Sequence, residues 1–290
     1  MNAGACEYTK LSGQLTNPIS CIGSGPTGSS PAGRHYIRRK CIAGTILTGL
    51  LFIFIMIPVD ARADDLLMYC GAGLRQPVDE LISLYRQKTG ENIIVEFGGS
   101  GLLLTRYRAS KKGDLFLAGS QFYTDQLKSD GKSASVYPLV LHVPVVAVNI
   151  KSKSMIKNFA DIAKPGVRLG LGDHRSMALG RTAGVILERS GLKDAILKNT
   201  VVYAATVKQL TLYVAMGNVD AAIIARADAF QNKDRLVYFD INRKWYDPEI
   251  VTMAVFNTSK KIERAKNTAE FFSSPDSIKI FTEYGFLPAN

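Results

Sequence analysis

Three glycine-rich loops lie where this sequence passes from a strand pattern into a helix pattern. They cover residues 71–73, 98–101 and 172–180. The first turn of a helix has backbone N–H groups without partners and the positive end of the helix dipole, so it can bind an anion. The glycines of any one loop could serve only to make a tight turn. Three such loops in one chain favour an anion-binding site.

No set of side chains predicts catalysis. Beyond residue 63 the histidines are His142 and His174, and neither has the spacing of a zinc site. His142 lies in an apolar segment and is expected to pack in the core, and Cys70 is expected to be a small buried residue. Ser100 lacks the G-x-S-x-G context of a hydrolase, and the chain has no P-loop and no dinucleotide fingerprint. The sequence therefore predicts a protein that is not an enzyme and has no cofactor and no metal site.

The composition indicates a globular protein with a positive charge. Of the 290 residues, 47% are hydrophobic and 21% are charged, and the formal net charge is +11. A positive charge suits an anionic ligand, and it equally suits a protein that only needs to stay soluble. Basic and aromatic residues do not interleave as they do on nucleic-acid-binding surfaces, so we expect no nucleic acid partner.

Strand and helix patterns alternate along residues 64–290. Segments 66–70, 92–97 and 114–117 have strand patterns, and segments 77–88, 102–110 and 122–129 have helix patterns. The alternation continues with strands at 168–171, 200–203 and 221–224 and helices at 181–190 and 207–216. Short connections between such elements indicate an α/β fold with parallel sheets covered on both faces. Ligands of these sheets bind at the carboxyl ends of the strands, where the three loops lie.

The first 63 residues indicate a disordered extension followed by an export signal. Residues 1–33 are rich in Gly, Ser, Thr and Pro and have no structural period. A basic cluster at 34–40, an uncharged apolar run at 41–59 and a small-residue site at 61–63 follow in the order of a secretory signal peptide. We predict cleavage after Ala63 and a periplasmic or otherwise exported protein. The alternative is that the run from Cys41 to Val59 is retained and anchors the protein in the membrane.

Five segments after residue 63 resemble the molybdate- and tungstate-binding proteins that serve ABC importers. They keep the order of that family and lie at 67–81 (LMYCGAGLRQPVDEL), 97–119 (FGGSGLLLTRYRASKKGDLFLAG), 169–180, 206–229 and 271–288 (FFSSPDSIKIFTEYGFLP). The resemblance implies a two-lobed periplasmic-binding-protein fold of type II, with the ligand cleft between the lobes. It implies one lobe from residues 64–141 and 242–290 and another from 142–241, with crossovers near 137–150 and 240–250. It further implies a monomer that delivers its ligand to a membrane permease.

The resemblance also implies positions for the ligand, and this chain departs from the family at two of them. Ser100 matches a hydroxyl donor, and Leu179 and Val207 match backbone N–H donors. Gly73 lies where the family usually has Ser or Thr, and Ala225 lies where a Tyr commonly donates its hydroxyl. Two side-chain donors of the family are therefore missing.

Charged residues near these positions could replace the missing donors. Arginine binds oxyanions through two parallel hydrogen bonds, and Arg75 is the first candidate because it follows Gly73 by two residues, at the start of a helix. The further candidates are His174, Arg181 and Arg226. Each of them could also be an ordinary solvated surface charge.

The sequence thus predicts an exported solute-binding protein that captures a small oxyanion, first of all molybdate or tungstate, for an ABC importer. A metal would be present only as part of that oxyanion. Two alternatives stay open. The protein could instead be a membrane-anchored ligand-sensing domain, or it could carry a different anion, such as sulfate or a small organic anion.

Overall fold

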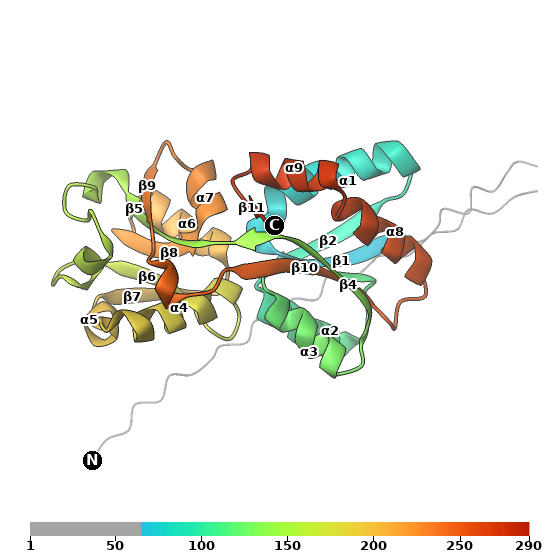
Figure 1. Cartoon of the computed structure of the whole chain (residues 1–290), viewed down its shortest axis with the longest axis horizontal. Helices are drawn as coiled ribbons and strands as arrows, with labels where there is room; N and C mark the ends of the chain where they lie inside the picture. Colours follow the sequence, from blue (N-terminus) through green and yellow to red (C-terminus); the bar gives the residue numbers. More distant parts are fainter. Residues whose placement is uncertain (1–64, 290) are drawn as a thin grey trace, which may run out of the picture. The chain divides into compact units, whose positions relative to one another are not determined.

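We describe residues 65–289 of the chain in a computed structural model (Figure 1). The predicted extension, the signal sequence and the cleavage site after Ala63 lie outside these residues. Among residues 65–289, none of the helices is both long and apolar enough to cross a bilayer.

The described residues form two α/β lobes, each built around one sheet. The first sheet has the order β11-β4-β10-β3-β1-β2 and the second has the order β7-β6-β8-β5-β9. The strands of the first sheet are β1 (Leu66–Gly71), β2 (Ile93–Gly98), β3 (Leu115–Ala118), β4 (Ser133–His142), β10 (Glu249–Phe256) and β11 (Leu287–Pro288). Those of the second are β5 (Pro144–Asn149), β6 (Leu169–Gly172), β7 (Thr200–Ala204), β8 (Ala221–Ala225) and β9 (Leu236–Asp240).

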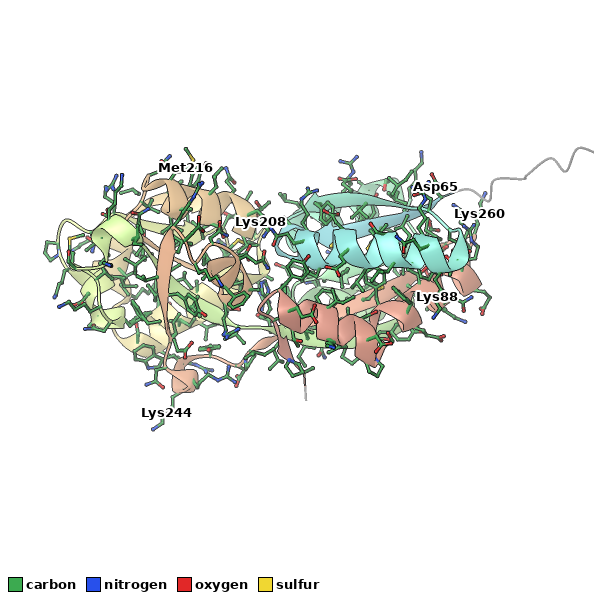
Figure 2. The ribbon with its side chains drawn as sticks, turned by 90° about the horizontal axis from the view of Figure 1, so that it is seen from above. Asp65, Lys88, Lys208, Met216, Lys244 and Lys260 are labelled. Atoms are coloured by element: carbon green, nitrogen blue, oxygen red, sulfur yellow. The ribbon has the colours of Figure 1, made fainter. Side chains whose placement is uncertain are left out.

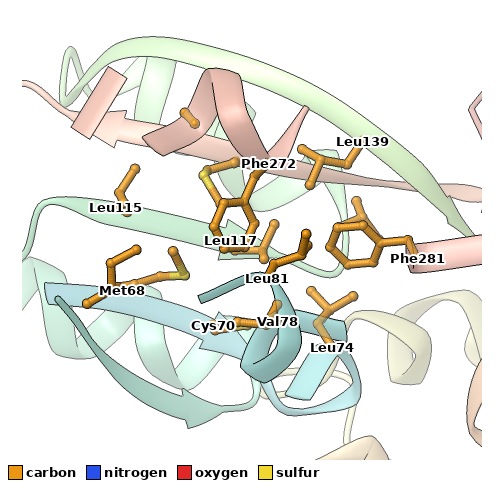
Figure 3. Close-up of a cluster of buried hydrophobic side chains, with 14 of the residues drawn as sticks. Met68, Cys70, Leu74, Val78, Leu81, Leu115, Leu117, Leu139, Phe272 and Phe281 are labelled. Carbon is orange, nitrogen blue, oxygen red and sulfur yellow. The ribbon is translucent and has the colours of Figure 1, made fainter. Parts of the chain in front are cut away.

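Helices cover both faces of the first sheet because its strands are apolar on both sides. The helices on one face are α1 (Arg75–Thr89), α8 (Ile262–Phe272) and α9 (Pro275–Glu283), and those on the other are α2 (Ser100–Ser110) and α3 (Gln121–Ser129) (Figure 1). Side chains alternate along β1, so Met68 and Cys70 pack against α1 and α8 while Tyr69 packs on the side of α2. Figure 3 shows Met68, Cys70, Leu81 and Phe272 in the first of these layers.

The second sheet is covered in the same way. One apolar layer contains α4 (Ala178–Ser190) and α5 (Lys193–Lys198), and the other contains α6 (Val207–Met216) and α7 (Arg226–Gln231). Four short 3-10 segments complete the elements: η1 (Ala72–Leu74), η2 (Ile150–Ser152), η3 (Phe159–Ala163) and η4 (Arg243–Trp245).

Both sheets are mixed, so the prediction of parallel sheets was wrong in part. Strands β1, β2 and β3 are parallel, but β10 runs antiparallel to β3 and β4, and β5 runs antiparallel to β8 and β9. Of the antiparallel strands, β5 and β10 connect the lobes, whereas β11 lies at the edge of the first sheet and pairs antiparallel with β4. Strand β4 leads through Val143 directly into β5, and β10 returns to the first sheet after β9. Pro144 fits this crossover because proline is tolerated at the first residue of a strand.

Candidate functional site

Three helical N-termini and the short 3-10 segment η1 meet at one small cavity between the lobes. The 3-10 segment η1 begins at Ala72, α2 at Ser100, α4 at Ala178 and α6 at Val207, and all four residues line a cavity of about 20 Å³. The cavity lining contains no Lys, Arg, Asp or Glu side chain. Its polarity therefore comes from the first-turn N–H groups, which lack partners within their own helices, and from two side chains, those of Ser100 and His142.

Ser100 offers its hydroxyl to this cavity. The residue is 4% exposed, and its Oγ accepts a hydrogen bond from the Gly119 N–H at 3.1 Å. An accepting hydroxyl keeps its own proton, which is free to point at a ligand. The N-cap of α2 is Gly99, and the Ser100 side chain does not cap the helix. The hydroxyl is thus fixed from the neighbouring strand and available to an oxyanion.

Gly73 lacks a side chain because Val207 fills the space that one would need. A Cβ on Gly73 would lie 2.6 Å from Cγ1 of Val207, well inside van der Waals contact. Val207 is held at the start of α6 by Thr206, whose side chain caps the helix by accepting from the Gln209 N–H at 3.2 Å. A serine or threonine at position 73 would clash here. The position of Val207 therefore excludes a side-chain hydroxyl at residue 73.

The second glycine-rich loop allows the lobes to touch. A Cβ would lie 2.3 Å from the Ser176 carbonyl oxygen if placed on Gly99, and 2.0 Å from the Arg175 carbonyl oxygen if placed on Gly101. The Gly101 N–H donates to the Ser176 oxygen at 3.1 Å. The φ of Gly99 is −69°, which any residue can adopt, so the tight-turn interpretation does not explain this glycine. The glycines are needed for the close approach of the second lobe.

Comparisons with known proteins identify the family to which this arrangement belongs. Residues 66–287 match the family described as bacterial extracellular solute-binding proteins. The chain is also 42% identical over 235 residues to a binding protein of Haemophilus influenzae, covering 81% of this chain and 96% of the relative. The chain belongs to the family of bacterial extracellular solute-binding proteins.

Solved structures agree with the fold of this solute-binding protein. The periplasmic molybdate-binding protein of Azotobacter vinelandii has a TM-score of 0.71 at 16% identity, covering 78% of this chain and all of that one. The binding protein AfuA of Actinobacillus pleuropneumoniae, solved with fructose 6-phosphate, has a TM-score of 0.69 at 15% identity, covering 78% of this chain and 85% of that one. These likenesses confirm the two-lobed α/β fold. One neighbour is named for molybdate and the other was solved with fructose 6-phosphate, so the fold alone does not define the ligand here.

Three of the predicted ligand positions line the cavity of the solute-binding protein, and two others are buried but are not part of the lining. Gly73, Ser100 and Val207 are part of the lining. Leu179 is the second residue of α4 and is fully buried, and Ala225 ends β8 and is also fully buried. The side chains of Leu179 and Ala225 are not part of the lining.

The charged candidates have other contacts and do not line the cavity. Arg75 is exposed and stacks on the ring of Phe97 at 3.9 Å, and Arg181 stacks on the ring of Phe122 at 3.3 Å. Arg226 donates from Nη1 to the Gly285 carbonyl oxygen at 2.7 Å. His174 is exposed in the loop before α4. A role of these side chains in holding the ligand stays a prediction.

His142 lines the cavity, although its sequence context suggested a packed core histidine. The side chain is 5% exposed, and its Nδ1 lies 3.0 Å from the Gly119 carbonyl oxygen. Its Nε2 is buried and has no hydrogen-bond partner among the described residues. Burial lowers the pKa of His142 from its usual 6.5 and outweighs the carboxylates of Asp228 and Glu249, which raise it. One feature of the sequence could have predicted this position. His142 is the last residue of a strand just before the crossover, at the edge where the lobes meet.

The described residues contain no group of three or more His, Cys, Asp or Glu side chains that could hold a metal ion. Cys70 is buried next to Gly71, and burial raises the pKa of its thiol well above the usual value. A thiol in this state is a poor nucleophile, which agrees with its expected role as a small packing residue.

Proposed function

We propose that this solute-binding protein captures a small oxyanion in the cavity between its lobes and delivers it to the permease of an ABC importer. The observation that carries the proposal is the meeting of three helical N-termini, those of α2, α4 and α6, together with the Ser100 hydroxyl, at one cavity. Such N–H groups and dipoles bind anions without a full positive charge nearby. We further propose that the protein works as a monomer outside the cytoplasmic membrane, which the extracellular character of the family supports.

Molybdate and tungstate are the first ions to test. The sequence resemblance supports them, and the Azotobacter protein that shares the fold is a molybdate-binding protein. The size of the cavity supports a small ligand as well. A single water needs about 10–15 Å³ of such space, so a cavity of about 20 Å³ has room for one or two atoms of that size in this closed arrangement. A tetrahedral ion is smaller than a sugar phosphate, so the lobes would have to part less to admit it.

Replacing Ser100 by alanine tests the proposal. Ser100→Ala should weaken binding of the captured ion by about 1–3 kcal/mol, because a hydrogen bond to a charged group is lost. A thermal-shift panel of molybdate, tungstate, sulfate, phosphate and small carboxylates would first identify the ion, since a tight ligand stabilises the folded state by mass action. Isothermal calorimetry would then give the dissociation constants of the variant and the wild type.

Ser110→Ala is the matched control for this experiment. Ser110 lies at the other end of α2 and is exposed, so its variant should bind like the wild type. Unchanged affinity of Ser100→Ala with a lowered melting temperature would show that Ser100 only holds the Gly119 N–H. That outcome would count against this cavity as the binding site.

A further inference from the structure

His142 presents one ring nitrogen to the cavity and has the other one fixed. A carbonyl oxygen can only accept, so the contact of Nδ1 with the Gly119 oxygen places a proton on Nδ1. In the neutral ring Nε2 then carries a lone pair, and in the charged ring it carries a second N–H. This nitrogen is buried, lies close to Gly73 of the cavity lining and has no partner among the described residues. Buried polar atoms nearly always have a partner, so a ligand atom is the natural partner here.

The surroundings of His142 contain two carboxylates and little positive charge. A Cβ on Gly73 would lie 3.9 Å from Nε2 of His142 and 3.3 Å from Oδ2 of Asp228, so the imidazole and this carboxylate face the same small region. Asp228 is fully buried on α7, and its Oδ1 lies 2.8 Å from Nζ of Lys208 on α6. Oδ2 has no hydrogen-bond partner among the described residues.

The second carboxylate belongs to Glu249, which pairs with His142 in the register of β4 and β10. Hydrogen bonds from Ser120 and Thr182 hold it in place, the latter at 2.7 Å. Arg226, on the same helix as Asp228, is turned toward the Gly285 carbonyl oxygen. On the remaining side the ring of Phe286 lies 6.1 Å from the imidazole, centroid to centroid.

We propose that His142 binds the captured oxyanion through Nε2, and that the closed complex holds one proton between Nε2 and a ligand oxygen. A dianion then binds together with one proton from solvent, which converts the imidazole to an imidazolium that donates to the ligand. An oxyanion that already carries a proton can instead donate it to the neutral Nε2. This inference rests on the proposed function, because it assumes that an oxyanion occupies the cavity.

A proton taken up on binding would partly balance the negative charge of a dianion in this site. The cavity lining has no charged side chain, and Gly73 and Ala225 lie where the resemblance to molybdate-binding proteins implies side-chain hydroxyls. An imidazolium formed on binding would supply one positive charge and one charge-assisted hydrogen bond, which is about twice as strong as a neutral one. In the empty protein burial keeps the ring neutral, so no unpaired positive charge has to be buried before the ligand arrives.

The sign of the pH dependence follows from this linkage. The empty site has a pKa for His142 below 6.5, and a bound dianion raises it. Between the two values binding takes up a proton, so affinity for a dianion falls as pH rises, by up to about tenfold per pH unit. Below the pKa of the empty site the ring is already charged, and affinity no longer depends on its titration.

Calorimetry with fully ionised dianions tests the inference. Molybdate, tungstate and sulfate would be titrated into the wild type near pH 7.5 in two buffers of different ionisation enthalpy. The difference between the two apparent binding enthalpies gives the number of protons taken up, and we expect about one proton per ion bound. His142→Gln cannot take up a proton, so it should abolish the uptake, flatten the pH profile and weaken binding about tenfold or more. Ser100→Ala, in contrast, should weaken binding and keep the proton uptake.

The outcomes separate this inference from the proposed function. Binding of these dianions without proton uptake, and with an affinity that does not change with pH, would overturn the role of His142 and leave the oxyanion site standing. If none of the oxyanions binds to the wild type, the proposed function fails and the inference fails with it. If His142→Gln does not fold, the two-buffer measurement on the wild type still decides, because it needs no variant.

Discussion

Replacing Gly101 by alanine should weaken oxyanion binding about a hundredfold or more, while each lobe keeps its fold. The added Cβ would lie 2.0 Å from the Arg175 carbonyl oxygen, which is backbone and cannot swing aside. The lobes would have to stay apart, and the hydrogen bond from the Gly101 N–H to the Ser176 oxygen would be lost. The ligand would then lose its contacts with the starts of α4 and α6. Two hydrogen bonds to a charged group, at about 1.5–3 kcal/mol each, account for the expected factor.

Small-angle scattering and calorimetry would check this expectation together. The wild type should become more compact at saturating ligand, because contacts from both lobes favour hinge closure. Gly101→Ala should keep the larger radius of gyration at every ligand concentration that can be reached. An unchanged affinity and a normal decrease in radius would show that the close approach of Gly101 to the second lobe is not needed for binding.

Gly184→Ala provides the matched glycine control. Gly184 lies inside α4 on the exposed side, and a Cβ there would have no atom within 4 Å. Alanine in a helix interior is favoured over glycine by about 0.5–1 kcal/mol, so this variant should be slightly more stable. Its affinity and its radius of gyration should match those of the wild type. The comparison separates a general effect of losing a glycine from the steric effect at the lobe contact.

The sequence pattern located the loops of the site but placed the helix starts too late. The patterns predicted helices from residues 102 and 181, whereas α2 begins at Ser100 and α4 at Ala178. Glycine has a low helix propensity, so a loop rich in glycine gives no helical signal even where it forms the first turn. The shift matters because it brings Ser100 and Ala178 to the first positions of their helices, where N–H groups are free.

Side-chain contacts between elements far apart in the sequence could not be assigned from sequence alone. The stacking of Arg75 on Phe97 and the packing of Val207 over Gly73 depend on side-chain direction, which no local pattern gives. His142 is the clearest case. Its apolar neighbours predicted burial, and it is buried, but only the crossover between β4 and β5 brings it to the cavity. An apolar sequence context is therefore compatible with a position in the cavity lining.

The mixed sheets have a similar origin. The repeated strand and helix patterns describe the β1–α1–β2 type of unit well, and β1, β2 and β3 are parallel as those patterns predict. The parallel strand direction is not kept where the chain passes from one lobe to the other, because β4 and β10 cross between the sheets without a covering helix. The proline-containing segment at 137–150 was expected only as a crossover, and it turned out to contain most of β4 and all of β5.

Removing the ammonium group of Lys208 should destabilise the second lobe strongly. Figure 2 shows Lys208 on the side of this lobe that faces the first. Its Nζ lies 2.8 Å from Oδ1 of Asp228 and 3.1 Å from Oε1 of Gln231. Asp228 is fully buried, so Lys208→Met would leave a carboxylate in the interior without its charged partner. Breaking a buried pair in this way costs about 3–5 kcal/mol, and we expect the lower end because the Lys208 side chain is 28% exposed.

Urea unfolding of three variants would test this expectation. Lys208→Met should lower the midpoint at an unchanged slope, which indicates a loss of stability without a change in the surface exposed on unfolding. Adding Asp228→Asn should recover most of the loss, because the penalty comes from the unpaired charge and not from the missing lysine. Lys193→Met is the surface control. Its pair with Glu188 has side chains 44% and 62% exposed, so its loss should cost less than about 1 kcal/mol. Equal losses for the two lysine variants, or no recovery in the double variant, would mean that Asp228 does not depend on Lys208 for its place in the core.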